Sequence, residues 1–330
     1  MNFAIIGAGL SGLIAATDLQ AAGHNVMLFD KGRGPGGRMS TRRAETDFGQ
    51  LRFDHGAPAF EVTTPEFAEE VQRWVERGCV GFWPGPHRLL TDYGKTVRDD
   101  ATAYYVGSPR MNGLHRHLAQ ALDIAWQMRV TTVERVGGKY RLEFEQGDPM
   151  AVFDGLIIAL PYEQAIALCA ESQTLSALSL PELVSYPCWS MMLAYPSAAS
   201  PNWSSLRFAD GPIALISHEN SKPHRDGVTR FVVHASAAWS QTNLEHKPDD
   251  ILAALIPEMQ ALTGLASPEF STAHRWRYAQ IARQPEAMPA WFPEHALGLC
   301  GDWISPVHGV EGAWSSAKKL ATMIIQSAVD

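Results

Sequence analysis

The chain has 330 residues, of which 46% are hydrophobic and 19% charged, and its formal net charge at pH 7 is −8. This composition supports a large core and excludes a disordered chain. The acidic balance argues against nucleic acid as a general partner, because binding to phosphates needs a basic face.

The four cysteines stand far apart and form no C-x-x-C pair, which argues against a zinc site and a disulfide framework. We therefore expect no metal and reduced thiols. The first residues run into an apolar strand pattern without a secretion signal, and no apolar run reaches the roughly 18 residues of a membrane span. These features predict a cytoplasmic protein without a membrane partner; no sequence pattern sets an oligomeric state.

The first thirty residues have the pattern of a dinucleotide-binding unit. An apolar strand, N-F-A-I-I, leads into G-A-G-L-S-G, then a helix ending near Gly23, then a strand ending at Asp30. Gly7 permits a tight turn, Gly9 lets a pyrophosphate approach the backbone, and Gly12 allows close packing of helix on strand. The helix N-terminus offers N–H groups to phosphate, and the acid can accept from ribose hydroxyls. The predicted contacts are Gly7, Ala8, Gly9, Leu10, Ser11, Gly12 and Asp30.

A basic, glycine-rich stretch, G-R-G-P-G-G-R-M-S-T-R-R, occupies residues 32–43. Four glycines and a proline in its first half exclude a helix or a central strand. Because the chain as a whole is acidic, we interpret the stretch as a local anion site. The alternative is a solvated surface loop.

Later segments complete an α/β unit. We predict a hairpin at 128–144, a buried strand at 154–161, a strand at 296–303 and a helix from Val310. No second G-x-G-x-x-G follows a strand, so a second dinucleotide domain is not expected. The stretches 189–195, 213–218 and 229–236 alternate in polarity and predict an antiparallel sheet. The fold is therefore a discontinuous Rossmann-type domain, 1–65, 105–162 and 292–330, with an inserted α+β substrate domain, 66–104 and 163–291.

The loop after the acidic strand end, the F-D-H-G-A that follows it and the late Gly-Asp pair resemble the flavin amine-oxidase superfamily. The resemblance implies FAD, with Arg38 at the pyrophosphate, Val130 at the adenine and Gly301-Asp302 near the ribityl chain. The helix from Val310 would point its N-terminus at the isoalloxazine, and Gly312 and Ala313 would leave room for the ring. The residues implied in this way are Lys31, Gly37, Arg38, Met39, His55, Gly56, Ala57, Val130, Gly301, Asp302, Val310, Glu311, Gly312 and Ala313.

The sequence departs from the amine oxidases of that superfamily at two points. Between 161 and 290 the only lysines are Lys222 and Lys247, and each precedes a proline, which predicts loops. Gly309 stands where the second aromatic of the amine cage is found. Cys300 precedes the Gly-Asp pair without evident reach to the flavin ring, so we expect FAD to be bound without a covalent bond.

A closer resemblance is to the renalase family, in particular its bacterial members, and it spans nearly the whole chain. The motifs are R-G-P-G-G-R-M, H-E-N-S-K-P-H-R at 218–225, V-V-H-A-S-A-A-W-S at 232–240, A-H-R-W-R-Y-A at 273–279 and C-G-D-W at 300–303. The resemblance implies oxidation of 2- and 6-dihydro-NAD(P) isomers to NAD(P)+, a repair of damaged metabolites. Oxygen would accept the electrons and give hydrogen peroxide.

A dihydropyridine becomes an aromatic cation when its hydride leaves, and no proton has to be removed. Orientation over the acceptor then does most of the work, so we predict no catalytic acid or base in the protein. The candidate substrate contacts are Trp189, Asn220, His234, Trp276 and Arg277. Core packing for the tryptophans and His234, and a carboxylate partner for Arg277, are the alternatives. As functions, an amine oxidase with an atypical pocket and a non-catalytic flavin-binding protein remain alternatives.

Overall fold

The computed structural model describes residues 1–91, 96–148, 150–172, 174–175, 180, 182–197, 200–282 and 290–327. The chain forms two compact units. The first comprises Met1–Gly37, His115–Val184 and Ile281–Asp330, and the second Arg38–Leu114 and Ser185–Gln280.

A six-stranded sheet is the centre of the first unit, with the order β19-β20-β13-β1-β2-β9. All neighbours are parallel except β19 and β20, which are antiparallel. The carboxyl ends of the parallel strands therefore meet at one edge of the sheet. The bounds are β1 Asn2–Ile6, β2 Asn25–Asp30, β9 Asp123–Trp126, β13 Gly155–Ile158, β19 Trp291–Phe292 and β20 Leu297–Leu299.

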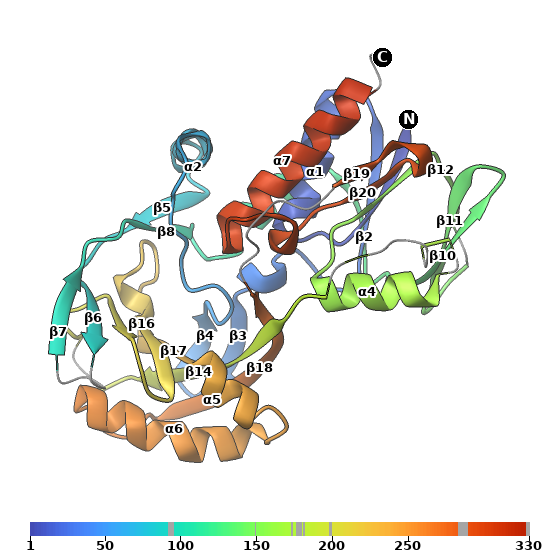
Figure 1. The fold of residues 1–330 in the computed structure, drawn as a ribbon. Helices are drawn as coiled ribbons and strands as arrows, with labels where there is room; N and C mark the ends of the chain where they lie inside the picture. The colour runs from blue at the N-terminus through green and yellow to red at the C-terminus, as the bar shows by residue number, and fades with distance from the viewer. Residues whose placement is uncertain are drawn as a thin grey trace. The chain divides into compact units, whose positions relative to one another are not determined.

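Helices α1 (Leu10–Ala21) and α7 (Gly309–Ser327) lie side by side in this unit (Figure 1), and Lys318 of α7 pairs with Asp18 of α1 at 2.7 Å. A three-stranded antiparallel sheet, with α4 packed on its first strand, covers another part of the unit. Its anchor is Phe29 of β2, whose ring contacts two phenylalanines of that sheet. The bounds are β10 Val130–Val136, β11 Lys139–Phe144, β12 Met150–Phe153 and α4 Tyr162–Glu171.

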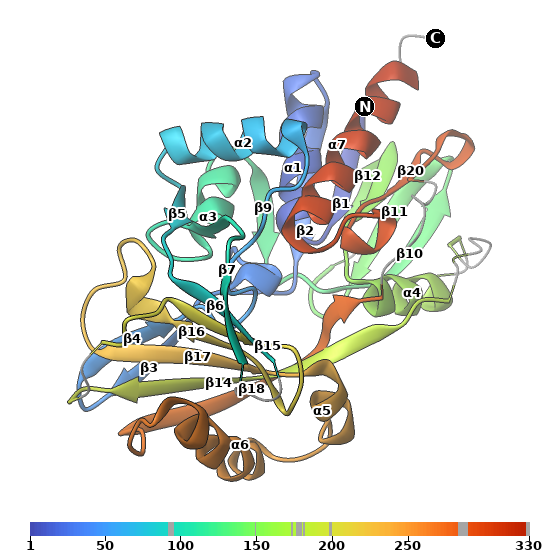
Figure 2. The same cartoon turned by 60° about the vertical axis from the view of Figure 1, so that its left-hand side comes forward.

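The second unit is built on a seven-stranded sheet with the order β18-β14-β17-β16-β15-β6-β7 (Figure 2). Two hairpins, β3–β4 and β5–β8, and helices α2, α5 and α6 complete it, and α3 (Gly113–Ala119) spans the boundary of the units. The bounds are β3 Arg42–Thr46, β4 Gly49–Phe53, α2 Pro65–Glu76, β5 Val80–Trp83, β6 His87–Thr91, β7 Thr96–Asp100, β8 Tyr104–Gly107, β14 Ser185–Tyr195, β15 Ser205–Phe208, β16 Ile213–His218, β17 Thr229–Ala235, α5 Ala237–Thr242, α6 Pro248–Thr263 and β18 Phe270–Ile281.

Strand alternation gives this second sheet two buried faces. Trp189, Met191, Leu193 and other residues of one face pack against Ile251 and Leu255 of α6. On the opposite face, Met192, Ala194 and Val232 pack against Leu51 and Phe53 of the β3–β4 hairpin. Each apolar strand stretch therefore has a partner layer, which explains why β14 and β17 are buried along most of their length.

The structure confirms the predicted α/β fold class, with the first strand, helix and acidic strand, the 130–144 hairpin, the 155–158 strand and the C-terminal helix in place. The predicted sheet of the second unit needs one correction. Strands β14, β17 and β16 are antiparallel neighbours, but β6 and β15 pair in parallel. The parallel pair joins segments more than a hundred residues apart. The alternation of polar and apolar residues along a strand does not indicate which distant strand will be its neighbour.

The bounds of the compact units differ from those of the predicted domains. Residues 38–65 and 105–114 belong to the second unit, and 163–184 and 281–291 to the first. The assignment of cofactor and substrate roles to 1–65, 105–162, 292–330 and to 66–104, 163–291 stays a prediction. Among the described residues, no helix is long and apolar enough to cross a bilayer.

Candidate functional site

The carboxyl edge of the first unit's sheet is where the candidate cofactor residues gather. Strand β1 lies between β2 and β13, so the chain passes to one side of β1 through α1 and to the other through the later segments. Ligands of open α/β sheets bind at such a switch point, beyond the strand ends. Gly7 directly follows β1, Asp30 ends β2, and Gly301 lies two residues after the end of β20.

The three glycines of G-A-G-L-S-G have different surroundings. Gly7 has φ +107°, and a Cβ there would lie 2.7 Å from the carbonyl oxygen of Ala159. A Cβ on Gly12 would lie 2.0 Å from the Gly7 carbonyl oxygen, so only glycine lets α1 pack this closely on the turn. A Cβ on Gly9 would meet no atom within 4 Å. The open position is therefore the one predicted to face the pyrophosphate.

Gly9 also caps α1, and it has no side chain that could accept from the first turn. Leu10, Ser11 and Gly12 form that turn, whose N–H groups have no partner inside the helix. The helix dipole adds positive character there. An open glycine beside such a turn fits a phosphate of a dinucleotide.

Asp30 ties the turn to the end of β2. Its Oδ2 accepts from the Ala8 N–H at 2.7 Å, and its Oδ1 accepts from the Gly32 N–H at 2.6 Å. The sequence predicts a ribose contact for Asp30 and gives little indication of this structural role. The signal was Gly32, where a Cβ would lie 2.8 Å from Asp30 Oδ1. Since each carboxylate oxygen has two lone pairs, the ribose contact stays a prediction.

The glycine-rich loop returns to the first turn. A Cβ on Gly37 would lie 3.6 Å from the Gly9 Cα, so the two backbones are neighbours within the first unit. Lys31 at the start of the loop donates to the Gln164 side chain at 2.9 Å, and Val130 begins β10 opposite Phe144. The later residues Arg42 and Arg43 belong to strand β3 of a two-stranded hairpin.

The predicted C-terminal contacts are packed tightly. The Gly301 N–H donates to Ser316 Oγ at 3.0 Å, and a Cβ on Gly312 would lie 2.0 Å from the Val307 carbonyl oxygen. The side chains of Asp302, Val310 and Glu311 are buried and that of Ala313 is half-buried. Burial raises the pKa of the Cys300 thiol to about 12, against the opposing effect of a hydrogen bond with Ser11. This thiol is therefore protonated at neutral pH.

In the second unit, residues 55–57 form a tightly held segment. The Ala57 N–H donates to the Arg38 carbonyl at 2.8 Å, and a Cβ on Gly56 would lie 2.0 Å from the same oxygen. Trp276 Nε1 donates to the His55 carbonyl at 2.9 Å, and His234 Nε2 lies 3.3 Å from it. Met39, the residue after Arg38, is also buried. The structure thus brings Trp276 and His234, two predicted substrate contacts, to one carbonyl group.

The histidines of this region are weak bases. Burial lowers the pKa of His55 to about 3, with His274 and Arg42 acting in the same direction. Burial lowers the pKa of His234 to about 4. Both rings are therefore neutral at physiological pH, and they do not accept a proton readily.

The other three candidate substrate contacts have structural partners. Trp189 is buried beside α6, and its indole N–H donates to the Asn243 carbonyl at 3.0 Å. The Asn220 side chain donates to the Gly227 carbonyl and accepts from the Arg230 N–H. Arg277 is exposed and donates twice to the Glu245 carboxylate, at 2.7 and 2.9 Å. Their contact with a substrate stays a prediction.

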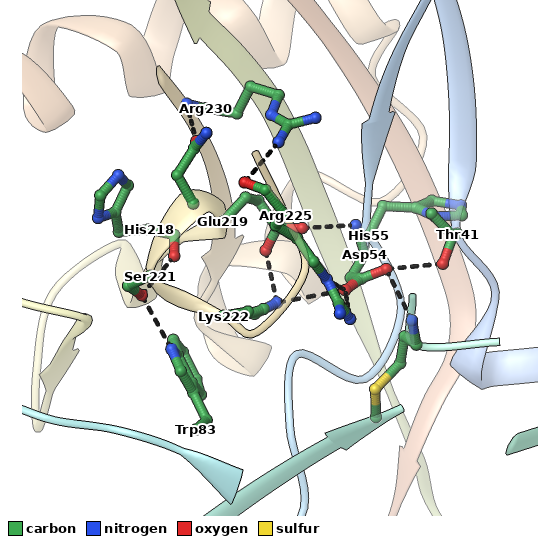
Figure 3. A network of polar contacts seen from close by, with 12 residues as sticks. Thr41, Asp54, His55, Trp83, His218, Glu219, Ser221, Lys222, Arg225 and Arg230 are labelled. Carbon is green, nitrogen blue, oxygen red and sulfur yellow. Dashed lines mark hydrogen bonds and ion pairs between the residues drawn. The ribbon is translucent and has the colours of Figure 1, made fainter. Parts of the chain in front are cut away.

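The second unit contains a buried charge network that the sequence analysis did not predict (Figure 3). It contains two carboxylates and three cations, Asp54, Glu219, Lys222, Arg225 and Arg230, all at most 7% exposed. Burial alone would raise the pKa of Asp54, but Lys222 and Arg225 outweigh it and hold the value at about 2. Lysine before proline in a polar stretch predicted a loop, correctly, but gave no sign that the lysine is buried.

The fold and the glycine turn define a Rossmann-type nucleotide-binding protein. Comparison with family models then gives the particular family. Residues 5–77 match an NAD(P)-binding Rossmann-like domain, and residues 78–325 match the model described as flavin containing amine oxidoreductase. The chain belongs to the flavin containing amine oxidoreductase family, whose cofactor is a flavin.

Individual relatives are distant. The chain is 28% identical over 177 residues to flavin-containing monooxygenase FMO GS-OX-like 2 of Arabidopsis thaliana, covering 48% of this chain and 35% of that protein. It spans little more than a third of the length of the curated relatives it matches. Cyclohexylamine oxidase of Brevibacterium oxydans IH-35A superposes with a TM-score of 0.77 at 12% identity, over 100% of this chain and 99% of that chain. Putrescine oxidase with bound putrescine gives 0.70 at 13% identity, over 99% of each chain. These two likenesses establish the fold.

Proposed function

We propose that the flavin is FAD and that the first unit binds its nucleotide part. The turn at Gly7 to Gly12 and the N-terminus of α1 would hold the pyrophosphate, Asp30 the ribose and Val130 the adenine. When bound, FAD supplies the hydride acceptor N5 and passes the electrons to oxygen, giving hydrogen peroxide. The protonated Cys300 thiol supports non-covalent binding, because the thiolate is the nucleophilic form of cysteine.

We further propose that the protein is a renalase-like oxidase of 2- and 6-dihydro-NAD(P) isomers. The observation that carries this proposal is the lack of basicity of His55 and His234. A group with a pKa of about 3 or 4 is a poor general base at neutral pH, where a catalytic base has a pKa near the working pH. Oxidation of a dihydropyridine requires no such base, because hydride departure leaves the aromatic cation directly.

The ion pairs of Lys222 also favour a dihydronicotinamide oxidase over an amine oxidase. Its Nζ donates to Glu219 Oε1 and lies 3.7 Å from Asp54 Oδ2, with the Trp83 ring centroid at 5.1 Å. The Lys222 ammonium group is thus held by two carboxylates inside the second unit, and the residue is 2% exposed. The other lysine of the stretch, Lys247, caps the start of α6.

The residues that orient a substrate would come from the second unit. Trp276 offers an aromatic face, and its indole nitrogen is fixed at the His55 carbonyl. His234 is fixed at the same carbonyl through Nε2 and is neutral, and its buried Nδ1 has no hydrogen-bond partner among the described residues. A fixed flat ring and a neutral nitrogen suit a dihydronicotinamide, which is itself flat and uncharged at the ring.

An anaerobic stopped-flow experiment tests the proposal. Rapid bleaching of the oxidised flavin by 6-dihydro-NAD or 2-dihydro-NAD, with no bleaching by 4-dihydro-NADH or by amines, is the expected result. Bleaching by an amine alone would replace the proposal with an amine oxidase of atypical pocket. If none of these compounds bleaches the flavin, the protein is a flavin-binding protein without this catalysis.

A further inference from the structure

Apart from Asn220, the stretch H-E-N-S-K-P-H-R, residues 218–225, has no role in the cofactor or substrate contacts proposed above. It forms a short 3-10 turn, Glu219–Ser221, and the chain that follows it. Three of its charged side chains are almost wholly buried: Glu219 is 1% exposed, Lys222 2% and Arg225 7%. One carboxylate and two cations leave the loop with a net positive charge, so it needs a further carboxylate as a partner inside the unit.

That partner is Asp54, the residue directly before His55. Arg225 donates to Asp54 Oδ2 through Nη2 at 2.7 Å and through Nε at 3.2 Å, and Lys222 Nζ lies 3.7 Å from the same oxygen. The other carboxylate oxygen accepts from the Thr41 hydroxyl at 2.6 Å and the Met111 N–H at 3.1 Å. The Asp54 carboxylate is therefore fully bonded and fixed in direction.

The backbone of Asp54 is held by the same stretch. Its N–H donates to Glu219 Oε2 at 2.9 Å, while Glu219 Oε1 accepts from Lys222 (Figure 3). Arg225 also donates to the carbonyls of Pro223 and Gly107, each at 2.8 Å, which ties the guanidinium to its own loop and to the end of β8. One residue is thus gripped at both its amide and its side chain.

The grip continues into the next three residues. Trp276 and His234 hold the His55 carbonyl, and Arg38 accepts from the Ala57 N–H. Gly56 has no room for a side chain against the Arg38 carbonyl. Because Asp54 is fixed on one side and Ala57 on the other, the backbone of the two residues between them is held in one conformation.

Buried ion pairs contribute little net stability, because desolvation of the charges offsets their attraction. The network is thus a costly way to stabilise the fold but an effective way to set the direction of a loop. We propose that Lys222 and Arg225 are positioning residues, which act through Asp54 to fix the backbone of His55, Gly56 and Ala57. The inference rests on the proposed function in one respect: it takes up the FAD contacts that the family resemblance predicts for His55, Gly56 and Ala57.

Two variants and one control test the inference. Arg225→Lys keeps the charge but loses the forked pair of bonds to Asp54, and Lys222→Met removes the charge in a side chain of similar length. Leu255→Ala is the control, because it opens a cavity under α6 in the same unit without touching Asp54 or its partners. If Lys222→Met does not fold, Arg225→Lys and the control carry the test.

The first measurement is amide hydrogen exchange of the peptide that contains residues 54–57, by mass spectrometry on the holoprotein. The Asp54 and Ala57 amides should exchange about 10-fold faster or more in Arg225→Lys and Lys222→Met, and at the wild-type rate in the control. Wild-type exchange in both variants, or equal acceleration in Leu255→Ala, would overturn the inference and leave a merely structural network.

The second measurement uses the bound flavin. We expect a shifted visible absorption band and a rate constant of flavin reduction lowered by about 10- to 100-fold in the two variants, as small misplacements near a reacting group produce. The control should keep both at wild-type values below its unfolding temperature. If no dihydronicotinamide bleaches the wild type, the proposed function fails, but amide exchange still decides the positioning role. Faster exchange with an unchanged flavin band would show that the segment does not contact the flavin.

Discussion

Gly9→Ala separates the cofactor role of the glycine turn from its role in folding. Gly9 has φ −72° and ψ 179°, which alanine adopts without strain, and its Cβ would meet no atom within 4 Å. The fold should lose only the small preference of a helix N-cap for glycine over alanine, about 0.5–1 kcal/mol. A thermal midpoint of the apoprotein lowered by no more than about 2–4 °C follows from that value.

Cofactor affinity should fall much further. If a phosphate approaches Gly9, a methyl group there prevents at least one backbone bond to a charged oxygen, worth about 1.5–3 kcal/mol. That loss corresponds to about a 10- to 150-fold rise in the dissociation constant of FAD. The assay is a fluorescence titration of the apoprotein with FAD, beside thermal unfolding of the same samples.

Two companion variants make the result decisive. Gly34→Ala also places its Cβ in open space, but in the glycine-rich loop of residues 32–43, and should change neither the fold nor the affinity. Gly12→Ala would place its Cβ 2.0 Å from the Gly7 carbonyl oxygen and should destabilise the apoprotein itself. Wild-type affinity for FAD in Gly9→Ala would refute the reasoning, and so would a large loss of apoprotein stability in that variant.

Three further predictions follow from the second unit and from α3. With the pKa of His55 at about 3 and that of His234 at about 4, the rate of flavin reduction should not change with pH between about 5.5 and 8.5; a bell-shaped profile in stopped-flow traces would reveal a catalytic acid or base. Trp276→Phe loses the 2.9 Å bond to the His55 carbonyl, so unfolding curves should show about 1 kcal/mol lower stability; an unchanged midpoint would contradict this. Burial lowers the pKa of His115 from 6.5 to about 4, so the unfolded chain binds the extra proton in that window and stability falls as the pH falls through it. In His115→Phe, the slope of the unfolding free energy against pH in this window, measured by denaturation curves, should be smaller by at most about 1.4 kcal/mol per pH unit. An equal slope in the variant and the wild type would contradict this.

The first unit could be predicted from sequence because its signals are local. Strand, glycine turn, helix and acidic strand follow one another within thirty residues, and each glycine has a steric reason that the structure repeats at Gly7 and Gly12. The role of Asp30 was harder to predict from sequence. A carboxylate that accepts from two backbone N–H groups has the same sequence position as one that accepts from ribose.

The buried network could not be predicted because its pairs are distant in sequence. Asp54 and Arg225 are 171 positions apart, and nothing in the local pattern of either residue indicates the other. Lysine before proline predicts a loop, which is correct for Lys222, but exposure does not follow from loop conformation. Trp189 packs in the core beside α6, as the alternative interpretation of this tryptophan expects, and its contact with a substrate stays a prediction.

An anaerobic titration with product analysis tests the central proposal most directly. The holoprotein would be titrated with 6-dihydro-NAD, flavin absorbance followed, and the nicotinamide product identified by chromatography. We predict complete bleaching at one equivalent, with one NAD+ formed for each flavin reduced. Purified protein that binds no flavin, or flavin that stays oxidised while excess 6-dihydro-NAD is recovered unchanged, would contradict the proposal.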